Sequence, residues 1–399
     1  MSTNTVSEEI KLIASRGEIS FPKGLEGVIV AESTKSYVDG IGGKLYYHGI
    51  PIEQLADKST FEEVFYLLMY DHLPSVTELS EFKGLLTQYR EIPDAVYTMI
   101  QERGNRYNAQ PMALLRTAVS SLACWDESAE EDSPIAHQRE AIKITSKLST
   151  LVAAIGQASR GLPAVHPRAD LPHAANFLWM LTGQEPDPYL AHVLDVILIL
   201  HADHESNAST FAVTVVKSTL ADMYSAIVAG IGTLKGPLHG GANEEVMKML
   251  KEIGEPEQAE AWVMNAVAQK KKVPGFGHRV YKTMDPRATI LRQYAGEITR
   301  RAGTEKYLRM AEIIERTMVD KLGQKGIYPN VDFFSGIVLS SMGIDTPLFT
   351  PIFAVSRVAG WVAHAWEQRQ NNRLYRPRFV YVGPDHAEYV PVGERKPRP

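Results

Sequence analysis

Four segments in the second half of the sequence place polar side chains beside glycines or at predicted helix starts, and the first contains His239. It lies in residues 236–243, where three glycines disfavour a helix and allow the backbone to bend around a ligand. Asn243 predicts an N-cap for a helix over 244–253. The positive end of that helix favours a neutral imidazole, which can donate a hydrogen bond to a carbonyl oxygen. A lone histidine in a loop is, however, more often an ordinary surface residue.

The second segment contains His278 within the glycine-spaced residues 274–279, and it follows three consecutive lysines that end at Lys272. A backbone of this kind can approach a flat or phosphorylated ligand closely, and lysines suit phosphates. A turn behind a solvated helix end explains the same residues equally well.

The third segment, Asp285-Pro286-Arg287, predicts a helix start with Asp285 as N-cap and proline at the first position. A cation in the first turn opposes the helix dipole. Arg287 is better explained if an anion binds there, because arginine can grip a carboxylate through two donors.

The fourth segment places Asp332 between Val331 and Phe333, just after Asn330, which can cap the following helix. Apolar surroundings disfavour the charged carboxylate and raise its basicity, as a general base requires. An acid in a first helical turn is also mildly stabilising without any function, so both interpretations stay open.

Two further histidines, His201 and His204, share one face at the end of an apolar helix, which makes a metal site conceivable. A zinc site normally needs a third ligand, and the sequence has no H-E-x-x-H pattern. We therefore expect no metal, and two histidines that make hydrogen bonds in the core.

The elements that must position these residues are mostly helical. Residues 24–50 are rich in glycine and predict one or two small β-hairpins, and strand-like alternation returns only near residues 379–382. Helical periodicity covers roughly residues 77–90, 93–102, 111–125, 138–159, 173–182, 188–205, 208–232, 244–253, 257–271, 287–302, 304–322, 331–342 and 350–370. The pattern predicts a mainly α fold.

The bulk composition is that of a soluble enzyme. A chain of 399 residues predicts two domains, and a net charge of −5 argues against a general nucleic-acid binder. The single cysteine, Cys124, excludes an intramolecular disulfide and a cysteine zinc site. Residues 1–19 lack the pattern of a signal or transit peptide, and the apolar run at 193–200 is too short to span a bilayer. We expect a cytoplasmic protein.

Together, in this order and spacing, the segments resemble citrate synthases. The matching segments are residues 200–210, 237–243, 275–281, 285–287, 329–333, 349–351, 356–361, 364–368 and 376–377. With the glycine-rich start, the resemblance spans about residues 24 to 393. It implies a mainly α, two-domain multi-helical fold with a small N-terminal β element. Residues 1–235 and 340–399 would form the large domain, and 236–339 the small CoA-binding domain.

The resemblance also implies roles for three catalytic residues. His239 resembles the histidine that holds the thioester oxygen as acetyl-CoA enolises, and Asp332 resembles the base that removes the methyl proton. His278 resembles the histidine that polarises and then protonates the ketone of oxaloacetate. The implied activity is that of an acyltransferase which condenses acetyl-CoA with oxaloacetate to give citrate and CoA.

Binding residues follow in the same way. His204, Arg287 and Arg357 resemble the oxaloacetate contacts, and Arg376 resembles an arginine supplied across the interface of a homodimer. The residues that resemble the CoA-binding stretch are Lys272, Val273, Pro274, Gly275 and Phe276, with Lys282 as a phosphate contact. The resemblance implies no metal and no permanently bound cofactor, with the CoA thioester as co-substrate.

Three alternatives remain open from the sequence. The nearest is 2-methylcitrate synthase, which uses propionyl-CoA with the same catalytic residues. The presence of His201 slightly favours a citrate synthase over this alternative. One methylene changes selectivity by only about 1–3 kcal/mol in an apolar pocket. The others are an inactive paralogue kept as a ligand sensor, and a helical metalloprotein built on His201 and His204.

Overall fold

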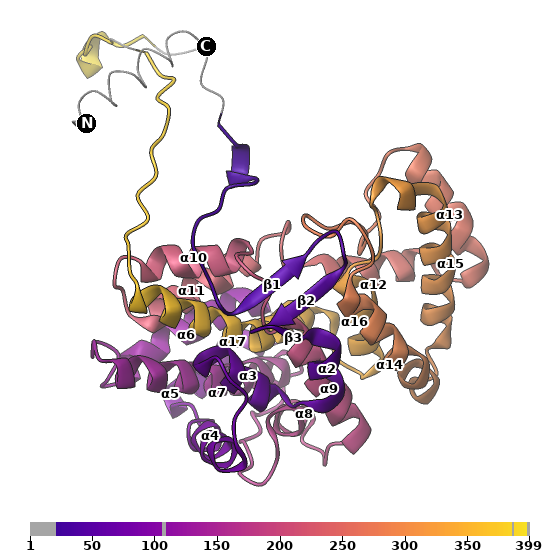
Figure 1. Ribbon diagram of the computed structural model, residues 1–399, viewed down its shortest axis with the longest axis horizontal. Coiled ribbons are helices and arrows are strands. Elements are labelled where there is room, and N and C mark those ends of the chain that lie inside the picture. Colours follow the sequence, from indigo (N-terminus) through magenta and orange to yellow (C-terminus); the bar gives the residue numbers. More distant parts are fainter. Residues whose placement is uncertain (1–20, 106–108, 385–386, 397–399) are drawn as a thin grey trace. The chain divides into compact units, whose positions relative to one another are not determined.

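The computed structural model describes residues 21–105, 109–384 and 387–396. The chain divides into two units: a main unit, Ser33–Leu374, and a terminal unit formed by Met1–Glu32 with Tyr375–Pro399. The main unit is dominated by helices and contains one small sheet (Figure 1). The mainly α fold expected from the sequence is therefore confirmed.

The helices of the main unit follow one another with short connections. The first eight are α2 (Ile52–Lys58), α3 (Phe61–Tyr70), α4 (Val76–Gln88), α5 (Asp94–Gly104), α6 (Pro111–Leu122), α7 (Pro134–Ser159), α8 (His173–Thr182) and α9 (Pro188–His201). The remaining eight are α10 (Ala208–Lys217), α11 (Met223–Leu234), α12 (Ala242–Ile253), α13 (Pro256–Ala268), α14 (Pro286–Ala302), α15 (Glu305–Leu322), α16 (Val331–Ser341) and α17 (Phe349–Gln370).

The sheet has three antiparallel strands, β1 (Ser36–Asp39), β2 (Lys44–Tyr47) and β3 (Ile50–Pro51), in the order β1-β2-β3. The hairpin expected within residues 24–50 is thus present. The strand expected at residues 379–382 is wrong: these residues form no strand, and Phe379 is 99% exposed. Alternating apolar residues do not make a strand unless another strand satisfies their backbone groups.

Two helix predictions need correction in detail. The single helix expected over 208–232 is two helices, because the chain turns at Leu220, which has a positive φ of 67°, and Asp222 then caps α11 by accepting from the Ser225 amide. Asn243 is not an N-cap. Helix α12 begins at Ala242 after Gly241, and the Asn243 side chain accepts instead from the adjacent Glu244 amide at 2.9 Å.

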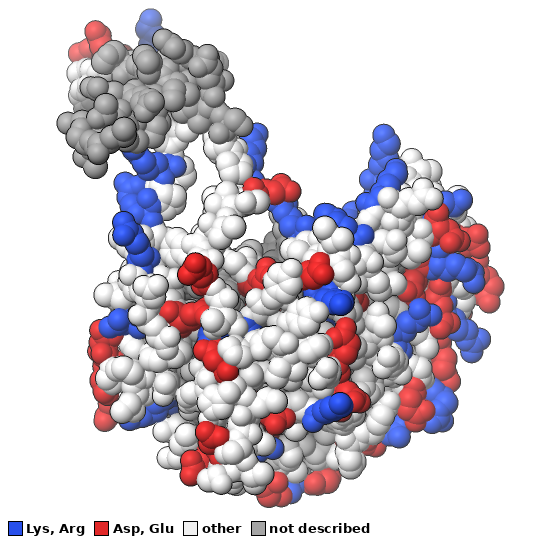
Figure 2. Space-filling view, viewed as in Figure 1, with Lys and Arg blue, Asp and Glu red and all other residues white. Residues whose placement is uncertain are grey.

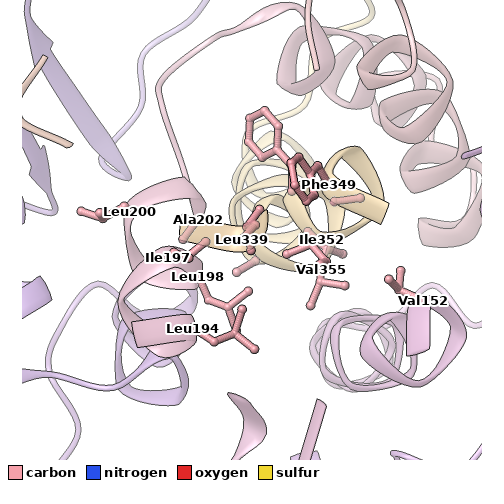
Figure 3. Packing of buried hydrophobic residues seen from close by; sticks show 14 of the residues in the cluster. Val152, Leu194, Ile197, Leu198, Leu200, Ala202, Leu339, Phe349, Ile352 and Val355 are labelled. Atoms are coloured by element: carbon pink, nitrogen blue, oxygen red, sulfur yellow. The ribbon is translucent and has the colours of Figure 1, made fainter. Parts of the chain in front are cut away.

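Helices α9 and α17 pack in the centre of the main unit and set the positions of later site residues. Leu194 and Ile197 of α9 and Ile352 and Val355 of α17 are buried and lie close together (Figure 3). The segment Thr346–Gln370 is long and apolar enough to cross a membrane, but its apolar window is wholly buried inside the structure. A helix that is apolar on all sides and covered by others is a core helix.

Helices α12 to α16 pack mainly on one another, α14 against α16 and α13 against α15, on one side of the main unit (Figure 1). They meet the other helices through contacts of α14 with α2 and α9, and of α12 with α17. In the face shown in Figure 2, acidic and basic side chains are interspersed over α13 and α15. This mixture is consistent with the small net charge of −5.

Candidate active site

The loop that carries His278 is fixed against the loop before α16. The Gly277 amide donates to the Tyr328 carbonyl at 2.9 Å, and the Asn330 amide donates to the Gly275 carbonyl at 2.9 Å. Gly275 has a φ of +77°, and a Cβ there would lie 2.8 Å from the Phe333 Cβ. Only glycine fits such a position, and this close contact with the two hydrogen bonds ties the loop that contains His278 to the start of α16.

His278 is a neutral imidazole whose Nε2 has no hydrogen-bond partner among the described residues. Its Nδ1 accepts from the backbone amides of Val280 and Tyr281 at 3.0 and 3.1 Å. The proton must therefore sit on Nε2. Burial and then the nearby Arg287 charge lower the pKa of His278 to about 4. At neutral pH this residue can donate a hydrogen bond from Nε2 to a carbonyl oxygen.

His239 has the complementary arrangement. Its Nε2 lies 3.3 Å from the Ser209 amide nitrogen, a donor, and 2.8 Å from Ser209 Oγ. Nε2 is thus an acceptor, and the proton sits on Nδ1. Burial and the Arg357 charge lower the pKa of His239 to about 4. The ring is neutral as the sequence predicts, but burial rather than a helix dipole is the main cause.

Asp332 is the second residue of α16 and has a basic carboxylate. The Asn330 side chain accepts from the Asp332 amide at 3.1 Å and donates to the Gly277 carbonyl at 2.9 Å. Oδ1 of Asp332 is buried and has no hydrogen-bond partner among the described residues. Burial raises the pKa of Asp332 to about 6, against the opposing effect of Arg287. Such a carboxylate can accept a proton at neutral pH.

His204 lies beside His278. Their ring centroids are 5.1 Å apart, and both rings contact Tyr281, whose hydroxyl is 3.4 Å from His204 Nε2. Burial, followed by the Arg287 charge, holds the pKa of His204 well below its usual range. The site therefore presents a second neutral histidine next to the first.

Arg287 is buried and already paired. Its Nε and Nη2 donate to the two carboxylate oxygens of Asp285 at 3.0 and 2.8 Å. The sequence predicts an external anion at Arg287, and the structure supplies an internal carboxylate for two of its donors. Nη1 has no acceptor among the described residues, which leaves one end of the guanidinium for a ligand.

Arg357 is buried without an acidic partner. Its side chain on α17 is 2% exposed; Nε donates to the His201 carbonyl at 2.7 Å, and the guanidinium lies over the Phe353 ring at 4.7 Å. No carboxylate of the described residues pairs with it. Burial lowers the pKa of Arg357 to about 10, so it remains charged. An unpaired buried cation favours the binding of an anion.

Side chains predicted from distant parts of the sequence lie near one another, because the charges of Arg287 and Arg357 both act on Asp332 and on His204. Phe353 lies between Arg357 and His239: the Arg357 guanidinium lies over its ring, and the centroids of the Phe353 and His239 rings are 6.4 Å apart. The His201 ring also packs on Phe353, with centroids 5.0 Å apart, but its Nδ1 bonds to the Ile197 carbonyl at 2.9 Å, as expected of a core histidine. No group of three potential metal ligands occurs among the described residues.

The residues expected to bind CoA differ in exposure. Lys272 and Lys282 are exposed, whereas Val273 and Phe276 are buried, and the Phe276 ring packs on Phe333 at 4.8 Å. Pro274, between them, is partly buried. Among the residues expected to bind CoA, solvent therefore reaches mainly the two lysines and, in part, Pro274.

Arg376 belongs to the terminal unit, where its Nη1 donates to the Pro377 carbonyl at 2.7 Å. Three residues that contact the candidates, Ser209, Tyr281 and Phe353, are not among those predicted from the sequence. Ser209 and Tyr281 at least lie in segments that resemble citrate synthases; Phe353 lies between two such segments and had no signal of its own.

The sequence matches the family description "Citrate synthase, C-terminal domain" over residues 24–378. The chain belongs to the citrate synthase family. It is 48% identical to a citrate synthase of Deinococcus radiodurans over 94% of this chain and 99% of the relative. It is 47% identical to citrate synthase 2 of Bacillus subtilis, again over 94% and 99%.

Solved citrate synthases have the same fold. The enzyme from Pyrobaculum aerophilum superposes with a TM-score of 0.88 at 42% identity, over 94% of this chain and 95% of that one. The enzyme from Thermoplasma acidophilum, in a ternary complex with carboxymethyl coenzyme A and oxaloacetate, superposes with a TM-score of 0.89 at 36% identity, over 94% and 100%.

Proposed function

We propose that this chain is a citrate synthase, an acyltransferase that condenses acetyl-CoA with oxaloacetate and water to give citrate and CoA. The observation that carries this proposal is one site with a basic, unpaired carboxylate oxygen on Asp332 and free N–H donors on the neutral His239 and His278. Membership of the citrate synthase family supports the same reaction. The CoA thioester is a co-substrate, and no permanently bound cofactor takes part.

Oxaloacetate is a dianion, and we assign its binding to Arg287, Arg357 and His204. Arg357 is a buried cation without an acidic partner, and Arg287 keeps Nη1 free. Arginine binds carboxylates through paired, charge-assisted hydrogen bonds. The ketone oxygen of the bound dianion would then lie at Nε2 of His278.

The first chemical step is enolisation. Asp332 takes a methyl proton from acetyl-CoA, while Nδ1–H of His239 donates to the thioester oxygen on which negative charge develops. A thioester methyl group is too weak an acid for a carboxylate alone, so the charge must be neutralised as it forms. Each positioned acid or base contributes roughly 10²–10⁴-fold.

The second step joins the two substrates. The enol carbon attacks the ketone carbon, and the ketone oxygen takes the proton from Nε2 of His278. The resulting citryl thioester is then cleaved by water, which gives the new carboxylate and releases CoA as a thiol. The low pKa values of both histidines, about 4, make each a neutral donor rather than a permanent cation.

For CoA we assign the stretch Lys272, Val273, Pro274, Gly275 and Phe276, together with Lys282. The exposed Lys272 and Lys282 would contact phosphates, and the backbone between them would contact the adenine. We also propose that residues 236–339 act as a small domain that closes on residues 1–235 and 340–399. Closure would exclude water during condensation.

We propose a homodimer in the cytoplasm, with Arg376 supplied to the partner's oxaloacetate site. Partly exposed apolar side chains along α10 and α11, among them Val215, Val216 and Val228, support a contact with a second copy. Mixed dimers test the role of Arg376. An Arg376→Ala subunit paired with an Asp332→Asn subunit should keep one complete site only if the arginine acts across the interface.

The activity itself is tested by the release of free CoA thiol. The wild-type protein should release thiol from acetyl-CoA only when oxaloacetate is present, and Asp332→Asn should lower kcat by roughly 10²–10⁴-fold. Oxaloacetate binding, measured by calorimetry, should persist in the variant because the arginines are unchanged. Asp320→Asn, an exposed carboxylate on α15, is the matched control.

Three outcomes would contradict the proposal. Near-normal turnover of Asp332→Asn would show that Asp332 is not the general base. Absence of thiol release from folded wild-type protein would show that the chain does not catalyse the condensation. A higher kcat/KM for propionyl-CoA than for acetyl-CoA would identify a 2-methylcitrate synthase instead.

A further inference from the structure

The carboxylate of Asp285 bridges the starts of two helices that are far apart in sequence. Oδ1 accepts from the Arg287 amide and from Arg287 Nε, both at 3.0 Å. Oδ2 accepts from Arg287 Nη2 at 2.8 Å and from the Val331 amide at 3.2 Å. Val331 is the first residue of α16, so one side chain fixes Arg287 and the helix that carries Asp332.

Helix capping alone does not explain this arrangement. Helix α9 starts with the same Asp-Pro pair, and there Asp187 caps its own helix by accepting from the Tyr189 and Leu190 amides, while its other oxygen makes a long, solvent-exposed contact of 3.4 Å with Arg301 Nη1. The Asp187 side chain is 46% exposed, whereas the Asp285 side chain is 1% exposed. Burial of a carboxylate costs free energy that a cap does not require, so the position of Asp285 needs another reason.

We propose that Asp285 is a positioning residue for both substrates, which holds Arg287 for oxaloacetate and the amino end of α16, and hence Asp332, for the acyl-CoA. The inference rests on the proposed function. By binding Nε and Nη2, Asp285 fixes the plane of the guanidinium and leaves Nη1 available to oxaloacetate. By binding the Val331 amide, it fixes the backbone one residue before the base.

The charge of Asp285 also acts on the base directly. The charged groups that influence Asp332 are Arg287, Arg357 and Lys272, which lower its pKa, and Asp285, which raises it. Loss of the Asp285 charge leaves the three cations unopposed. The carboxylate of Asp332 would then become a weaker base, and the acid limb of the activity profile would move to lower pH.

The test compares Asp285→Asn with Asp187→Asn, which changes a cap of the same Asp-Pro type outside the site. In Asp285→Asn, the KM for oxaloacetate should rise by roughly 10–100-fold, because a charged hydrogen-bond pair is lost. The midpoint of the acid limb of kcat/KM for acetyl-CoA should fall. Asp187→Asn should keep the wild-type KM and the wild-type midpoint.

If Asp285→Asn lowers only the thermal stability, or matches Asp187→Asn in both kinetic measurements, the positioning role is wrong. If Asp285→Asn does not fold, Asp285→Glu serves instead, because it keeps the charge and alters the length. It should raise the KM with an unchanged acid limb; a wild-type KM would overturn the inference. A wild-type protein that releases no thiol defeats the proposed function, whereas an active wild type with an unaltered variant defeats only the role of Asp285.

Discussion

Two carboxylates stand at the starts of neighbouring helices in the same site, and their surroundings are opposite. Asp285, before α14, has both oxygens occupied by hydrogen bonds. Asp332, in the first turn of α16, has a buried Oδ1 without a partner among the described residues. Although burial acts to raise the pKa of both, the Arg287 guanidinium lowers that of Asp285, whereas that of Asp332 rises to about 6.

The difference shows that hydrogen bonding decides whether a buried carboxylate holds its neighbours in place or is available to accept a proton. A carboxylate with four hydrogen bonds and a cation beside it stays ionised and holds its neighbours in place. A carboxylate left without partners keeps its affinity for a proton. The same residue type can therefore act as a fixed support at one helix start and, in the role we propose for Asp332, as a base at the other, which is how paired acids take separate roles.

The largest expected effect comes from removing the cation that supports Asp285. Arg287→Met should destabilise the protein by about 3–5 kcal/mol, because the buried Asp285 charge loses its partner. Arg357→Met should cost less, since no described carboxylate pairs with Arg357. Urea unfolding of the two variants measures the difference. Equal losses of stability would mean that Arg287 does not compensate Asp285.

A second effect concerns the stability cost of the base. The pKa of Asp332 is raised from 3.8 to about 6 on folding. The stabilisation of the folded protein that comes from protonated Asp332 is therefore fully present below pH 4 and is lost as pH rises through 6. At pH 7.5 the free energy of unfolding of Asp332→Asn, measured with urea, should therefore exceed that of the wild type by on the order of 1–3 kcal/mol. The advantage should vanish near pH 4. A less stable variant at pH 7.5 would show that the ionised carboxylate is not destabilising.

The smallest effect is on the pH dependence of the reaction. Because only ionised Asp332 can accept the methyl proton, kcat/KM for acetyl-CoA should fall about tenfold per pH unit below a midpoint near 6. His239 and His278 have pKa values of about 4 and should add no second step above pH 5. A two-proton slope between pH 5 and 7 would show that a histidine titrates there as well.

Much of the fold follows from the sequence, because long amphipathic or apolar segments have few alternatives to helices. The periodicity over 173–182 corresponds to α8, and that over 304–322 to α15 within one residue. The break between α10 and α11 does not follow, because it depends on a positive φ at Leu220 and on the Asp222 cap within a continuous apolar pattern. The residues at 379–382 alternate like a strand but have no pairing strand.

The site residues could be proposed from the sequence, but not their hydrogen bonds. Arg287 was interpretable as an anion site, yet its pairing with Asp285 depends on side-chain rotamers inside one turn of helix. The bond from the Val331 amide to Asp285 joins segments 46 residues apart, so only the packing of α14 on α16 creates it. The free Oδ1 of Asp332 is equally a product of tertiary packing.

The most direct measurement is a ¹³C NMR titration of protein labelled at the aspartate carboxyl carbons, with Asp332→Asn and Asp285→Asn used to assign the two signals. We expect the Asp332 signal to titrate with a midpoint near pH 6 and the Asp285 signal to remain that of a carboxylate down to pH 4. An Asp332 signal that titrates near pH 4 would contradict its assignment as a base kept reactive by burial.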